Sequence, residues 1–336
     1  MSQDIRSSRG PATQTGPTSP VSDSPPNAVQ TAPRSRRGDY LLTAVIGIFL
    51  PPLTLTLTGL ASRAAGAGQL PRIILFTVTV FIVSALAQWL FAARSSLGGL
   101  IGGAVALLAQ AVILARPGHA AAAPFAWARS LIPTGAVLIA AALLLGGSWG
   151  MRQARRAGRE DARLSSRLSA NDRTPGVTPA APPSRRRDHI LSFPLTLLAV
   201  GAALVLIANG YARLVTPGAI PSGAMLTALA ALALLIPAAA LTGRSTLGAR
   251  ATGALLILCA LPALLGGVWP NLPGRAALAG LLPDDPTGAS LLLTGILLTT
   301  AGWGAHLARR EGRARELLEL RSRETPTPPR GLPHAW

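Results

Sequence analysis

Apolar residues gather into eight blocks of about twenty residues, and polar residues lie between the blocks and at both ends of the chain. A helix of about 20 apolar residues crosses the hydrocarbon core of a bilayer, which is about 30 Å thick. Within that core every backbone polar group needs an internal partner, which favours helices. The pattern predicts an all-α integral membrane protein with eight transmembrane helices, approximately at 40–61, 73–93, 97–115, 131–150, 190–211, 224–242, 249–268 and 287–307.

The polar segments divide the chain further. Residues 1–34 are rich in Ser, Thr and Pro and lack the apolar residues that a core requires, so we expect a disordered tail. Residues 174–183, TPGVTPAAPP, have the composition of a flexible linker. The predicted organisation is an N-terminal tail (1–34), a first membrane repeat (35–150), a basic cytoplasmic loop with a Pro-rich linker (151–183), a second membrane repeat (184–308) and a cytoplasmic C-terminal helix and tail (309–336).

The two membrane parts resemble each other at four landmarks, which occur in one order at an offset of 149 to 154 residues. These are SRRGDYLL (35–42) and SRRRDHIL (184–191), RSSLGG (94–99) and RSTLGA (244–249), PTGA (133–136) and PTGA (286–289), and WGMRQARRAGR (149–159) and WGAHLARREGR (303–313). We interpret them as two tandem four-helix repeats. Because each contains an even number of spans, both copies have the same orientation, as in transporters built from parallel repeats.

Charge predicts the orientation and the compartment. The chain has a formal net charge of +18, and all 31 of its basic residues are arginine. The lack of lysine beside abundant Ala, Gly and Pro is typical of GC-rich bacterial genomes. Six arginines fall in the loops on one side of the membrane and the other 25 on the side of both termini. Cytoplasmic segments are the arginine-rich ones, so we expect a multi-pass protein of the bacterial plasma membrane with both termini in the cytoplasm.

The arginines flank apolar spans, so the expected partner is the anionic headgroup layer on the cytoplasmic side and not nucleic acid. Tryptophan also favours the membrane interface. Asp39 and Asp188 are candidate helix caps beside these arginines. The predicted headgroup or structural anchors are Arg36, Arg37, Arg94, Trp149, Arg155, Arg156, Arg185, Arg186, Arg187, Arg244, Trp303, Arg309 and Arg310.

Small residues mark the predicted third span. Gly98, Gly99, Gly102 and Gly103 form overlapping small-xxx-small patterns, which allow helices to approach closely. We expect them to pack within the chain, with homodimerisation as the alternative.

Reactive groups are scarce within the spans. The strongest polar candidates at depth are Gln88, Gln110 and Asn209, which we expect to form interhelical hydrogen bonds. The segment GGSWG (146–150) has the G-x-S-x-G spacing of hydrolases but ends a predicted transmembrane helix instead of joining a strand to a helix. A hydrolase would need Ser148 to meet His306 across the two repeats.

Other reactive groups have simpler explanations. Asp285 is expected to cap a helix that starts at Pro286. Cys259 has no second cysteine to pair with. We therefore expect no catalytic, cofactor or metal site.

These observations favour a non-enzymatic protein that acts through contacts, such as an envelope assembly factor or a subunit of a membrane complex. The alternative is a transporter or permease-like subunit for a neutral or amphiphilic solute, without proton coupling of its own, because proton relays normally use acidic or histidine side chains at depth. A polar cavity between the two halves would favour transport, and a tightly packed interface would favour a scaffold.

Overall fold

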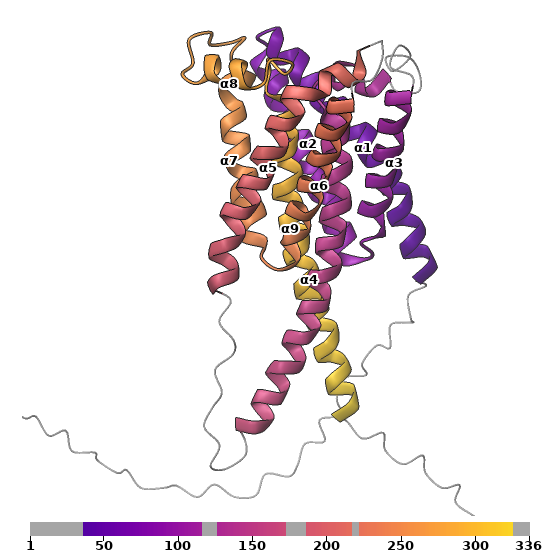
Figure 1. The fold of residues 1–336 in the computed structure, drawn as a ribbon. Coiled ribbons are helices and arrows are strands. Elements are labelled where there is room, and N and C mark those ends of the chain that lie inside the picture. The colour runs from indigo at the N-terminus through magenta and orange to yellow at the C-terminus, as the bar shows by residue number, and fades with distance from the viewer. Residues whose placement is uncertain (1–35, 116–125, 173–185, 217–221, 325–336) are drawn as a thin grey trace, which may run out of the picture. The chain divides into compact units, whose positions relative to one another are not determined.

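The computed structural model describes residues 36–115, 126–172, 186–216 and 222–324, and every regular element in these ranges is a helix. The all-α prediction is therefore confirmed. Eight of the described helices, α1–α7 and α9, are long and apolar enough to cross a membrane. The elements are α1 (Arg36–Gly66), α2 (Leu70–Ala93), α3 (Leu97–Ala115), η2 (Ala126–Leu131), α4 (Ala136–Asp172), α5 (Arg186–Val215), α6 (Ser222–Ala240), η3 (Leu241–Gly243), α7 (Thr246–Leu264), α8 (Arg275–Leu281) and α9 (Ala289–Glu324) (Figure 1).

Several helix ends differ from the predicted spans. The fourth span was expected from residue 131, but α4 begins at Ala136, directly after Gly135 with a φ of 71°. The eighth was expected from 287, but α9 begins at Ala289, directly after Gly288 with a φ of 65°. Only glycine adopts this left-handed backbone readily. The same Pro-Thr-Gly sequence therefore forms a turn, and the helix starts after it in both places.

Helices α4 and α9 are much longer than a membrane requires. They contain 37 and 36 residues, which corresponds to a length of ~55 Å against ~30 Å for the hydrocarbon core. Residues 151–172, which the sequence suggested as a polar loop, continue α4 as a helix. The continuation of α9 through residue 324 agrees with the C-terminal helix expected from the sequence. The expected disordered tail and the linker at 174–183 lie outside the described residues.

The bundle has two different ends. The short turns between α2 and α3 and between α6 and α7 lie at one end, which we call the turn end; α8 lies at the other, the loop end (Figure 1). From the turn end, α4 and α9 extend beyond the other helices, side by side (Figure 1). We call this extension, residues 151–172 of α4 and 305–324 of α9, the projection.

At the centre of the bundle α4 packs against α9, and the other spanning helices surround this pair. Helix α2 packs against α9 and α6 packs against α4, while α3 and α7 contact α4 and α9 respectively. Helix α1 packs against both α2 and α3, and helix α5 packs against both α6 and α7. In the most apolar window of α4 and of α9, 78% of the residues are buried, against 28% to 44% in the six other spans. The outer six helices thus present most of the surface that contacts lipid.

Glycines bring the two central helices together within the projection. A Cβ atom on Gly158 would overlap the carbonyl oxygen of Arg309, and a Cβ on Gly312 would overlap that of Arg155. Two ion pairs lie beside these contacts, Arg163 with Glu316 at 2.7 Å and Arg309 with Asp161 at 3.2 Å. The projection is therefore closely packed along its length.

Candidate functional site

The two helix entrances at the turn end are held by different polar contacts. At the start of α1, Asp39 accepts a hydrogen bond of 2.9 Å from Arg94, which follows α2. At the start of α5, Nδ1 of His189 lies 2.9 Å from Oγ of Ser245, and Ser192 donates to the same hydroxyl at 2.9 Å. Arg94 thus has a protein partner, as a structural anchor would.

The other predicted anchors lie in different settings. Arg155 donates to the carbonyls of Phe91 and Ala92 at 3.2 and 2.7 Å and so satisfies the C-terminus of α2. Arg309 pairs with Asp161. The exposed members are Arg37, Trp149, Arg156, Arg244, Trp303 and Arg310. Arg36 starts α1 and Arg186 and Arg187 start α5, while Arg185 lies outside the described residues.

The four glycines of α3 pack within the chain. Gly98 faces the ring of Phe91 and the carbonyl of Thr43, and Gly102 faces the carbonyl of Gly47. Gly99 and Gly103 face Ser148 and Leu145 of α4. All four are buried. Because α1, α2 and α4 cover this face, it is not a surface on which a second copy of the chain can pack.

The polar residues at depth behave in three ways. Gln110 accepts a hydrogen bond of 2.7 Å from the hydroxyl of Tyr211 and so joins α3 to α5, as expected. Gln88 is buried with no partner for its Oε1. The interhelical prediction is wrong for Asn209, which is exposed and donates to the Val205 carbonyl of its own helix at 2.8 Å.

The residues suggested for a hydrolase are not arranged for one. The hydroxyl of Ser148 is buried and donates to the carbonyl of Ser96. No hydrogen bond joins Ser148 to His306 among the described residues. In place of a nucleophile, Ser148 ties α4 to the turn between α2 and α3.

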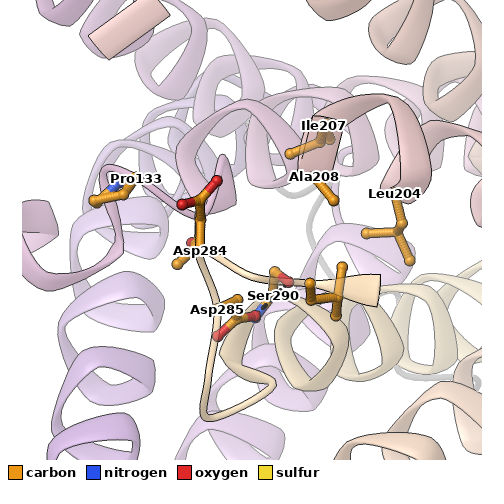
Figure 2. Close-up of a pocket in the computed structure, with 9 residues that line it drawn as sticks. Pro133, Leu204, Ile207, Ala208, Asp284, Asp285 and Ser290 are labelled. Carbon is orange, nitrogen blue, oxygen red and sulfur yellow. Dashed lines mark hydrogen bonds between the residues drawn. The ribbon is translucent and has the colours of Figure 1, made fainter. Parts of the chain in front are cut away.

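Asp285 caps α9 at the loop end. Its carboxylate accepts hydrogen bonds from the backbone N–H groups of Ala289 and Ser290, at 2.9 and 2.7 Å, and a third from the Ser290 hydroxyl. Figure 2 shows Asp285 beside Ser290 at the start of the helix. The expected cap is therefore present, but the helix begins after Gly288 and not at Pro286. The cavity beside it, lined also by Asp284 and Pro133, has a volume of only about 10 Å³, too small for a solute.

No cluster of three or more His, Cys, Asp or Glu residues occurs in the described ranges that could hold a metal ion. The single cysteine, Cys259, is exposed on α7.

A groove between α2, α7 and α9 combines one charged side chain with mostly apolar walls. Its volume is about 500 Å³. Arg250 of α7 contributes the charge, and its Nε and Nη2 atoms are buried without a hydrogen-bond partner. The Oγ1 of Thr299 is buried and unpartnered as well. We call this the Arg250 groove; its lining residues are Phe81, Ala85, Arg250, Ala254, Thr299, Thr300 and Trp303.

Sequence reasoning missed Arg250, because it was counted only as one of the 25 arginines on the side of both termini, at the start of the predicted span 249–268. One signal was available. Aligning RSSLGGL (94–100) with RSTLGAR (244–250) places Leu100 opposite Arg250. A charged residue that replaces an apolar one in an otherwise matching helix marks a position with its own chemistry.

No protein-family model, curated protein sequence or solved structure matches the chain.

Proposed function

We propose that the chain is a non-enzymatic subunit of a membrane complex, built from two tandem four-helix repeats in the same orientation, and that its projection binds a protein partner. The observation that carries this proposal is the projection itself. The two most buried helices leave the bundle together, and close glycine contacts and two ion pairs keep them together. A closely packed helix pair outside the membrane provides a surface for contacts and no route for a solute.

The packing supports the two repeats. Helix α2 lies on α9 as α6 lies on α4. The contacts of the projection are reciprocal: Gly158 faces Arg309 and Gly312 faces Arg155. Gly312 lies 154 residues after Gly158, and Arg309 lies 154 residues after Arg155. The same offset relates Trp149 to Trp303. A pseudo-twofold axis between α4 and α9, along the membrane normal, accounts for this reciprocity.

The distribution of charge supports a cytoplasmic turn end. Exposed arginines of the projection include Arg156, Arg159, Arg167, Arg310 and Arg313. Arginine-rich segments near span ends stay in the cytoplasm, where they attract anionic headgroups. Both termini would then face the cytoplasm of a bacterium, with the protein in its plasma membrane.

Two exposed leucines offer the projection an apolar contact. Leu164 on α4 is 45% exposed and Leu318 on α9 is 65% exposed. They are related by the same offset of 154. Exposed apolar residues on an otherwise charged surface mark candidate contact positions, and a paired arrangement suits a partner that contacts both helices.

The test is quantitative co-purification from the native host. The double variant Leu164→Gln/Leu318→Gln removes the apolar pair, and Arg159→Gln/Arg313→Gln is the matched control at two other exposed positions with the same offset. We expect one partner, in fixed ratio to the chain, to be retained by the wild type and the control and to be lost from the leucine variant. Equal retention by all three would contradict the proposal.

The alternative, a permease-like subunit for an amphiphilic solute, draws on the Arg250 groove. Reconstitution into proteoliposomes distinguishes this alternative function from the scaffold function. The purified chain in proteoliposomes should show no solute accumulation under an imposed pH gradient. Solute entry down its concentration gradient that is faster than in empty liposomes would favour the permease and contradict the scaffold. Uphill uptake that a protonophore abolishes would contradict the lack of proton coupling that both functions assume.

A further inference from the structure

The Arg250 groove combines an unpaired charge with apolar walls. Its polar members, Arg250, Thr299 and Thr300, come from α7 and α9, and α2 contributes only Phe81 and Ala85. The hydroxyl of Thr300 donates to the Ile296 carbonyl at 2.8 Å. No acidic residue lines the groove. The lining therefore offers donors and a positive charge but no negative charge to neutralise them.

A guanidinium group within a membrane protein ordinarily has a partner, because an unpaired buried charge is costly. Arginine presents its N–H groups in a planar fork that matches the oxygens of a phosphate or carboxylate. Two of the three guanidinium nitrogens of Arg250 are buried without a partner among the described residues. An anion from outside the described residues is the partner that this arrangement suits.

The charged side chain of the groove lies near the turn end, and its deepest members include the aromatic Phe81. Arg250 lies four residues after the start of α7 at the turn end, which places it ~6 Å along the helix axis. Ala254 lies one turn deeper on α7, and Phe81 lies one turn deeper than Ala85 because α2 ends at the turn end. Trp303, 41% exposed, belongs to a residue type that favours the membrane interface. The polar part faces the headgroup layer and the apolar part faces the acyl chains.

The corresponding place in the first half has a different lining. The residues at the equivalent offsets are Leu100, Leu145 and Gly146, in place of Arg250, Thr299 and Thr300. A Cβ on Gly146 would overlap the carbonyl oxygen of Ile236, so α6 packs tightly on α4 there. Thr300 has a side chain where Gly146 has none. The polar residues of the groove are therefore not repeated in the first half.

We propose that the Arg250 groove binds a phospholipid of the bilayer, with the headgroup phosphate on the Arg250 guanidinium and an acyl chain along Phe81 and Ala254. This site goes beyond the proposed scaffold function and does not depend on it. A neighbouring groove between α1 and α2, about 420 Å³ in volume, has a lining of apolar side chains and Trp89. It lacks a charged group that would select an anionic lipid over a neutral one, and so serves as an internal reference.

The experiment uses the full chain in detergent and compares lipid binding by native mass spectrometry and by thermal stability. The probes are phosphatidylglycerol, the neutral lipid diacylglycerol and inorganic phosphate. The variant Arg250→Leu copies the residue of the first half, and Arg213→Leu is the control, since it removes an exposed arginine near the end of α5 that does not line the groove. We expect Arg250→Leu to weaken phosphatidylglycerol binding about tenfold or more, with diacylglycerol binding unchanged. Arg213→Leu should bind as the wild type does.

Two further measurements keep the result interpretable. Arg250→Lys should recover only part of the affinity, because ammonium lacks the planar fork. Without lipid, Arg250→Leu should be at least as stable as the wild type, because an unpaired buried charge has been removed; this shows that any lost binding is not lost folding. Equal phosphatidylglycerol binding by wild type and Arg250→Leu would overturn the proposal. Stabilisation by inorganic phosphate as strong as that by phosphatidylglycerol would also overturn it, in favour of a site for free anions.

Discussion

The contact between α3 and α4 and the contact between α7 and α9 are equivalent, but the glycine belongs to the outer helix in the first and to the central helix in the second. In the first, Gly99 of α3 faces Ser148 of α4. In the second, Ala249 of α7 faces Gly302 of α9. The offsets in the sequence relate Gly99 to Ala249 and Ser148 to Gly302. In both regions the two helix backbones are close enough to require a glycine at the contact. That glycine can belong to either helix.

One helical turn further along, the facing residues of the two contacts differ in chemistry and are not simply exchanged between the helices. Leu145 faces Gly103 in the first region, and Thr299 faces Gly253 in the second. Thr299 and Arg250 replace Leu145 and Leu100, so polar groups stand where the first half has leucines. Packing glycines are thus matched between the two regions, while the residues that face the outer helix are not. Chemistry has diverged on the surface toward α2, where the central packing does not constrain it.

The largest effect should come from the reciprocal glycines of the projection. Gly158→Leu and Gly312→Leu each place a side chain on a backbone carbonyl of the facing helix. We expect each to destabilise the protein by about 2–3 kcal/mol, in the range of overpacked cores, and by equal amounts if the two halves are equivalent. Thermal unfolding in detergent measures this. Gly201→Leu on α5 is the control, since no atom lies within 4 Å of its Cβ position, and it should be neutral. A large difference between the first two variants would contradict the reciprocity.

A smaller effect should distinguish the starts of the two central helices. Asp285 accepts two backbone N–H bonds at the start of α9, whereas the equivalent offset in the first half holds Ile132. Asp285→Asn should lower the stability by about 1–2 kcal/mol, the usual range for a lost cap. Asp284→Asn, at the exposed neighbouring residue, is the matched control and should leave the melting temperature unchanged. If both variants melt alike, the cap contributes nothing measurable.

The exchanged glycines permit a double-mutant cycle. Gly99→Ala brings a Cβ to 3.3 Å from that of Ser148 and should cost ~1 kcal/mol, at the low end of overpacking. Combining it with Ser148→Gly copies the arrangement of the second half and should recover the packing term, although the hydrogen bond from Ser148 to Ser96 is lost. A coupling energy of at least ~0.5 kcal/mol between the two sites is expected for residues in contact. Strict additivity would show that the two helices do not share this space.

The smallest effect should come from the helix entrances. The Asp39–Arg94 pair has side-chain exposures of 25% and 36%, so solvent screens it, and Asp39→Asn should cost less than ~1 kcal/mol. Asp188 is exposed at the start of α5, and Asp188→Asn should have no effect. Melting temperatures at low and high salt test both variants, because only the effect of Asp39→Asn should shrink with salt. An equal salt response for Asp188→Asn would remove the difference between the entrances.

The sequence predicted those features that belong to single helices. Eight spans followed from length and apolarity, and the cap at Asp285 followed from its position before Pro286, although the helix starts three residues later than expected. The groove could not be predicted in the same way, because the isolation of Arg250 depends on the place of α2, which comes from a distant part of the chain. Asn209 was misplaced for the same reason: its depth along the chain was evident, but the face of α5 that it occupies was not.

The central position of α4 also has a consequence for how the protein is made. Helix α9 begins 153 residues after α4, from Ala136 to Ala289, so at ~5–20 residues per second α4 leaves the ribosome ~8–30 s before its main partner. During that interval the least hydropathic of the eight spans sits in the membrane with the face around Gly147, which packs on Ala301 of α9, uncovered. Insertion of α4 therefore depends on α3 and on whatever host factor shields the helix until α9 arrives. A chain that stops before α9 should be recognised by membrane quality control and degraded.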